Sequence, residues 1–155
     1  MQVFKDFPEN SRVWLYQTNR ALSATETNYV EEKLRSFTKE WAAHGKQLWA
    51  NAAILNAFFV AVVVDENITP PSGCSIDASV KFLKELGAEL DVDFFTRMKL
   101  TVQEGDDLKQ IDFHDLDKQE NPGDLMLFDA LVGDLSTLRN QWPVQLKNSN
   151  LKQLV

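Results

Sequence analysis

The sequence contains one cysteine, Cys74, and two histidines among its 155 residues. A lone cysteine forms no internal disulfide and is too few for a cysteine-based zinc cluster. The longest apolar run, residues 57–64, is far shorter than the roughly 20 residues of a membrane-spanning helix. The first residues show no basic segment followed by an apolar run. We therefore expect a cytoplasmic protein with no membrane partner, no cofactor and no metal.

Basic residues are also in the minority. Lysine and arginine number 16 against 23 aspartates and glutamates, which gives a formal net charge of −7. A phosphate backbone would meet net repulsion from such a chain. The charge balance excludes nucleic acid as an expected partner.

The remaining composition is that of a folded protein. Hydrophobic residues make up 44% and charged residues 25% of the chain, and a chain of this size buries roughly two-thirds of its unfolded surface. We expect a single α+β domain over residues 1–155, with a peripheral lead at 1–10 and a peripheral tail at 143–155.

The first half of the chain alternates strand and helix signals. Residues 11–19 are rich in β-branched and aromatic side chains, which favours a strand. A capping box of Ser23 and Glu26 then predicts the start of a helix, and Gly45 its end. Two strands follow with a tight turn near Asn56, and the second of them is apolar at every position.

The second half continues the same alternation. A helix is expected over about 76–86, then two strands joined by a glycine-containing turn at 104–107. Asn121 and Pro122 have the pattern of a helix start, which predicts a helix over 124–141.

The order of these elements predicts a ferredoxin-like split β-α-β sandwich with an extra C-terminal β-strand and helix. Two helices would cover one face of its sheet. Because the third strand is wholly apolar, the other face needs a cover as well, either the C-terminal helix or a second subunit. We expect a homodimer for this reason.

This topology places four chemically capable residues at one end of the sheet, namely His44, Asp65, Glu66 and Cys74. A thiol at a helix N-terminus has more thiolate character, and an imidazole beside it can act as a base. One hypothesis is therefore a thiol-dependent enzyme with Cys74 as nucleophile and His44 as base. The alternative is that Cys74 simply packs the start of the helix.

A third interpretation uses the main chain rather than the thiol. Free N–H groups at a helix start can bind a small anion, which favours a binding protein without catalysis. The site would comprise Ser72, Gly73, Cys74 and Ser75, with Asp65, Glu66 and Asp77 around it. No metal-ligand spacing is present among these acidic residues. A non-enzymatic binding or interaction protein is our leading prediction.

Four segments, SRVWLYQTNR, WAAHG, SGCSIDASV and LRNQWPVQLKNS, resemble an uncharacterised bacterial family of small cytoplasmic proteins. Some members of that family carry the label ABC transporter ATPase. The present sequence has no phosphate-binding loop and too few residues for a nucleotide-binding ATPase domain. The resemblance therefore implies a common fold unit and no activity.

Overall fold

The computed structural model describes residues 3–155 and has an α+β architecture with two main sheets. The first sheet has the strand order β1 (Arg12–Gln17), β5 (Phe59–Val64), β4 (Ala50–Leu55). Both pairings are antiparallel, so β1 and β4 run in the same direction with β5 between them. This is the split β-α-β connection that the sequence predicts.

Helix α1 (Ala24–Glu40) begins at the predicted capping box, where Glu26 N donates to Ser23 Oγ at 3.1 Å. It ends before Gly45, which corrects the expected end. The chain instead forms a hairpin of β2 (Ala42–Ala43) and β3 (Lys46–Gln47). His44 and Gly45 both have positive φ, 52° and 79°, as a type I′ hairpin turn requires. His44 is thus at a hairpin tip and not at a helix end.

The two predicted strands around Asn56 are confirmed as β4 and β5. Asn56 and Ala57 have φ of 56° and 64°, which again is the geometry of a tight hairpin turn. Every residue of β5 is buried, so this strand lies in the interior with both faces covered.

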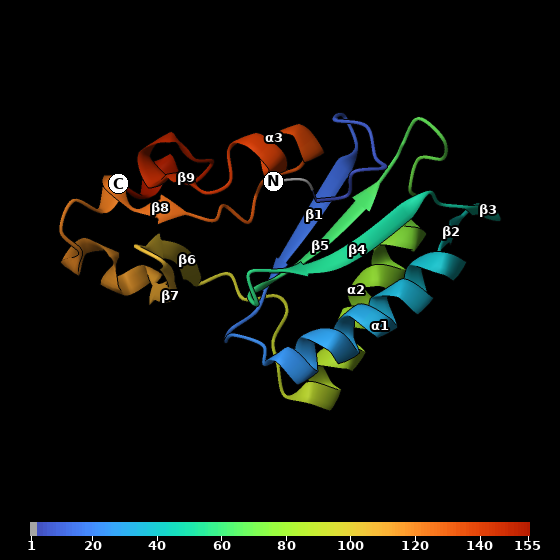
Figure 1. Cartoon of the computed structure of the whole chain (residues 1–155), viewed down its shortest axis with the longest axis horizontal. Coiled ribbons are helices and arrows are strands. Elements are labelled where there is room, and N and C mark those ends of the chain that lie inside the picture. The colour runs from blue at the N-terminus through green and yellow to red at the C-terminus, as the bar shows by residue number, and fades with distance from the viewer. Residues whose placement is uncertain (1–2) are drawn as a thin grey trace.

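Helix α2 (Gly73–Leu90) starts earlier and ends later than predicted. Its N-cap is Ser72, whose hydroxyl accepts from Ser75 N at 3.1 Å. Asp91 ends the helix in the left-handed conformation with φ of 55°. Figure 1 shows α1 and α2 together on one side of the first sheet.

The second sheet has the order β7 (Asp107–Asp112), β6 (Lys99–Glu104), β8 (Met126–Leu127), β9 (Val144–Gln145). The predicted strand pair with its turn at 104–107 is confirmed as β6 and β7. In a complete ferredoxin-like sheet, β6 would pair with the free edge of β1. Here β6 pairs with β7 and β8 instead, so the predicted fourth strand is absent from the first sheet.

The predicted helix over 124–141 is wrong. Asn121 has φ of 47° and Pro122 begins only a short 3₁₀ turn; the chain then forms β8. The C-terminal helix is the shorter α3 (Leu135–Asn140), capped by Asp134 Oδ1, which accepts from Thr137 N at 2.8 Å. The apolar residues that a helix over 124–141 would place on one face therefore belong to different elements.

The face of the first sheet opposite α1 and α2 is covered by the same chain (Figure 1). We call this layer the α3-side core; it contains Val13, Leu15, Phe59, Ala61, Val63, Phe128, Val132, Leu135, Leu138 and Trp142. The expected cover is thus the C-terminal segment. The apolar third strand no longer argues for a homodimer, whose existence stays a prediction.

Both segments expected to be peripheral contain some residues that pack on the body of the protein, although most residues of the first ten that are described, and residues 152–155, are exposed. Phe4 and Phe7 are buried in the α3-side core. In the tail, β9 pairs with β8, and Leu146 is fully buried beneath the second sheet. Within residues 3–155, no helix combines the length and apolar character needed to cross a bilayer.

Candidate ligand-binding cleft

No hydrogen bond joins the Cys74 thiol to the His44 imidazole in residues 3–155, so their pairing stays a prediction. Both side chains are exposed. The two elements that carry them do approach each other, because Trp41 Nε1 donates to Ser75 O at 2.8 Å. In the part of the chain that is described, however, no hydrogen bond or ion pair involves the Cys74 thiol or the His44 imidazole. No observation favours the thiol-dependent enzyme.

The polar side chains at the start of α2 satisfy each other. Ser72 N donates to Ser75 Oγ at 2.7 Å, and Ser75 Oγ donates to Ser72 O at 2.8 Å. Gly73 and Cys74 present exposed main chain, as the anion hypothesis requires. That hypothesis gains no second feature here and stays a prediction.

The three acidic residues proposed around that site have separate structural roles. Asp65 is buried, and its Oδ1 accepts from Asn67 N at 3.0 Å, which stabilises the loop after β5. Glu66 is paired with Arg12 at 3.3 Å. Asp77 is exposed just after the first turn of α2. No hydrogen bond or ion pair within residues 3–155 joins any of them to Cys74.

One group of potential metal ligands occurs elsewhere. Asp112, His114 and Asp115 have ligand atoms within 4.8 Å of one another. Lys118 Nζ lies 2.9 Å from Asp115 Oδ1, and this pairing lowers the pKa of Asp115. Lys118 already compensates the charge of Asp115, and we assign the group no metal.

A cleft of about 600 Å³ lies between the first and second sheets. Its walls come from β1, α2, β6, β8 and residues 91–98, which we call the linker because they join α2 to β6. The volume lies within the range of roughly 300–1,000 Å³ typical of ligand pockets. The cleft occupies the place where a ferredoxin-like fold would have its fourth strand.

The charged side chains that line the cleft are positive, whereas the chain as a whole carries a net negative charge. Lys84, Arg97 and Lys99 line it, whereas none of the described lining residues is an aspartate or a glutamate. Arg97 is exposed and makes no hydrogen bond or ion pair with any residue of the described range. Lys99 Nζ is 3.5 Å from Asn19 O. The cleft therefore combines positive charge with an available guanidinium.

The rest of the lining is mainly apolar and comes from both sides of β1. Tyr16 and Phe95 pack on the α1 and α2 side, with ring centroids 5.4 Å apart. Leu15 and Phe128 belong to the α3-side core. Leu131 also lines the cleft and is 60% exposed. Burial raises the pKa of Tyr16, whose hydroxyl is 3.5 Å from Ser79 Oγ.

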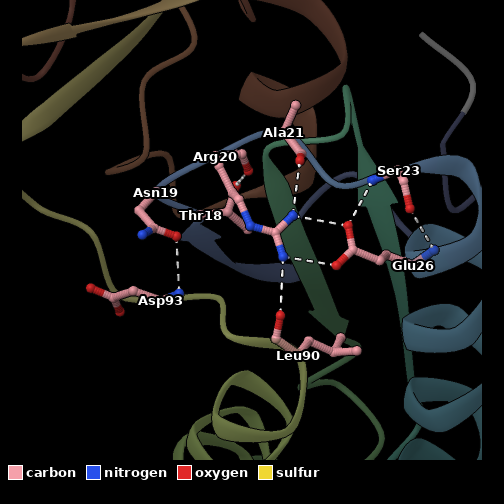
Figure 2. A network of polar contacts seen from close by, with 8 residues as sticks. All are labelled: Thr18, Asn19, Arg20, Ala21, Ser23, Glu26, Leu90 and Asp93. Carbon is pink, nitrogen blue, oxygen red and sulfur yellow. Dashed lines mark hydrogen bonds and ion pairs between the residues drawn. The ribbon is translucent and has the colours of Figure 1, made fainter.

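A polar network holds the linker in place (Figure 2). The guanidinium of Arg20 donates to both carboxylate oxygens of Glu26, at 2.9 and 2.8 Å, and to Leu90 O at 3.0 Å. Asp93 N donates to Asn19 Oδ1 at 3.0 Å. Through these bonds the loop after β1 holds the end of α2 and the linker in place. Because Phe94 and Phe95 belong to the linker, the bonds also position these two lining residues of the cleft.

Comparisons with protein-family models, curated proteins and solved structures found no match. The resemblance to a bacterial family therefore stays a prediction, and the case for function rests on the geometry of the cleft.

Sequence reasoning missed the cleft because its lining residues come from six separate segments of the chain. One local signal was present in residues 94–99, FFTRMK. Two phenylalanines followed by two cations within six residues are unusual in an acidic chain, and all but Met98 line the cleft.

Proposed function

We propose that this protein is a non-enzymatic binding protein whose cleft takes a ligand with an apolar body and at least one anionic group. One observation carries the proposal: three cationic side chains and no carboxylate line a largely apolar cleft in a chain of net charge −7. With carboxylates in excess over the whole chain, their exclusion from this surface favours recognition of negative charge. A cytoplasmic location and a homodimeric state are further predictions that accompany it.

The apolar and charged parts of the cleft have complementary roles in this proposal. Burial of ligand surface against Phe95, Phe128 and Leu131 supplies affinity at roughly 25 cal/mol per Å² of apolar area. The unpaired Arg97 and the half-buried Lys99 then select the anionic ligand over a neutral or cationic one of the same shape. Since these charges are partly solvated, the affinity should fall as ionic strength rises.

Calorimetric titration with decanoate tests the proposal, with decyltrimethylammonium as a probe of equal chain length and opposite charge. We expect decanoate to bind the full chain and the cationic probe to bind far more weakly. The double variant Lys84→Glu/Arg97→Glu should lose at least about tenfold in decanoate affinity, equivalent to about 1.4 kcal/mol.

The matched control is Arg35→Glu/Lys39→Glu, which makes the same change in net charge on the exposed face of α1. It should leave decanoate affinity close to that of the wild type. Equal losses in both double variants would attribute binding to net charge alone and would contradict a site in the cleft.

A further inference from the structure

The outer edge of β1 is open in the middle. Thr18 N donates to Phe58 O at 2.8 Å, so in the β1–β5 register the even-numbered residues of β1 pair with β5. The main-chain groups of Val13, Leu15 and Gln17 therefore point away from β5, toward the side where a fourth strand would lie.

Other segments pair with this edge only at its two ends. Val13 N donates to Gly133 O at 2.9 Å, and Thr96 N donates to Gln17 O at 3.1 Å. Four groups remain between them: Val13 C=O, Leu15 N–H, Leu15 C=O and Gln17 N–H. No residue in the range 3–155 forms a hydrogen bond with any of the four.

Three of these four groups belong to Leu15 and Gln17, and both residues, like Tyr16 between them, line the cleft. Their side chains are largely buried, with Leu15 9% and Gln17 5% exposed. Buried main-chain groups are almost always paired in folded proteins. An open strand edge that lines a cleft is therefore a template for an incoming strand.

We propose that the ligand of the cleft is an extended segment of an acidic polypeptide that pairs with β1 through the main chain of Leu15. This inference rests on the proposed function and specifies its ligand. The gap from Val13 to Gln17 is about 13 Å long at roughly 3.3 Å per residue, which limits the paired stretch to about five residues.

The pleat of the sheet predicts the sequence of that segment. A residue opposite Leu15 shares its face, so its side chain meets Phe128 and Leu131 and should be apolar. The residues on either side of it share the face of Tyr16, where Lys84 Nζ lies 6.0 Å from the Phe95 ring centroid. They should be acidic. The preferred pattern is acidic, apolar, acidic.

The test uses the peptide acetyl-Ser-Glu-Leu-Glu-Ser-amide with the ¹⁵N-labelled full chain at low salt, monitored by amide hydrogen exchange. We expect exchange at Leu15 and Gln17 to slow at least about tenfold at saturating peptide. The same peptide with an N-methylated leucine loses a main-chain donor and should not slow exchange. The Ser-Lys-Leu-Lys-Ser analogue, in which lysines replace both glutamates, tests whether binding requires the negative charge of the peptide.

Three results would overturn the inference. Equal binding of the N-methylated peptide would mean recognition through side chains alone. Slow exchange at Leu15 without peptide, in a chain that sediments as a dimer, would mean that a second copy occupies the edge. If the chain binds decanoate but the peptide has no effect, strand pairing is ruled out and the proposed function stands. If neither ligand binds, both the strand pairing and the proposed function are ruled out.

Discussion

The side chains of Gln17 and Thr101 form a buried hydrogen bond of 2.9 Å that joins the two sheets. Gln17 is the last residue of β1, and Thr101 lies in the middle of β6. Gln17 Nε2 also donates to Lys99 O at 2.9 Å, and Gln110 Nε2 donates to Thr18 O at 2.7 Å. This network fixes the separation of the sheets and so the width of the cleft.

Replacing Gln17, whose side-chain amide lies at the centre of this network, should therefore destabilise the folded protein. Gln17→Ala leaves Lys99 O without its side-chain donor and the Thr101 hydroxyl without its acceptor, although that hydroxyl still accepts from Gln110 Nε2; we expect a cost of about 2 kcal/mol or more in the free energy of unfolding. Urea denaturation measures it. Gln103→Ala on the same strand removes only an exposed bond to Gly105 O and should change stability little. Similar losses in the two variants would deny Gln17 this role.

The Arg20–Glu26 pair makes stability depend on pH. The Arg20 guanidinium, together with the Ser23 main chain, lowers the pKa of Glu26 from 4.5 to about 2. Between these two pKa values Glu26 is therefore ionised in the folded state, whereas it is protonated in the unfolded chain. Its contribution is complete above about pH 4.5 and is lost as the pH falls toward 2.

Glu26→Gln should flatten the dependence of the free energy of unfolding on pH between 4.5 and 2, as measured by denaturant titrations across that window. Glu40→Gln, at the exposed end of α1, serves as the control and should keep the wild-type slope. If Glu26→Gln retained that slope, the pair would carry no pH-dependent stability.

One buried hydroxyl contributes nothing through hydrogen bonding. Ser11 is 1% exposed, and its Oγ has no partner among the described residues. Ser11→Ala should leave the free energy of unfolding within about 0.5 kcal/mol of the wild type or raise it, because it removes an unpaired polar group. Ser149→Ala should instead cost about 1–2 kcal/mol, since Ser149 Oγ bonds Leu146 O at 2.7 Å and Leu151 N at 3.0 Å. A large loss in Ser11→Ala would reveal a partner for its hydroxyl.

The exposed Cys74 should react with iodoacetamide in the native protein without prior unfolding. His44→Ala should leave the rate of alkylation unchanged, because no hydrogen bond within residues 3–155 links the imidazole to the thiol. Mass spectrometry of quenched samples gives both rates. A marked fall in the rate for His44→Ala would restore the hypothesis of a thiol-dependent enzyme.

Elements with local signals were predictable from the sequence. The capping box of Ser23 and Glu26, the apolar run of β5 and the turn at Asn56 each fix local structure through neighbours in the chain. The helix expected over 124–141 failed because Leu125, Phe128 and Leu131 imitate a helical stripe. In the structure Leu125 packs beneath the second sheet, Phe128 enters the α3-side core and Leu131 is exposed.

The pairing of the fourth strand and the formation of the cleft depend on contacts between residues far apart in the sequence, which no local pattern encodes. Whether β6 pairs with β1 or with β8 is decided by contacts such as Gln17 with Thr101, 84 residues apart. The predicted site at Cys74 was a sound deduction about which ends of elements meet. In the structure Cys74 and His44 are exposed and share no hydrogen bond, whereas Asp65 is buried and bonded within its own loop.

The most direct test of the central claim locates the bound anion. Amide chemical shifts of the ¹⁵N-labelled chain, recorded during a decanoate titration, distinguish the cleft from the start of α2. We expect shifts centred on Tyr16, Phe95 and Arg97 that saturate together. Shifts confined to Gly73, Cys74 and Ser75, with the cleft resonances unmoved, would contradict it and place the anion at the helix N-terminus.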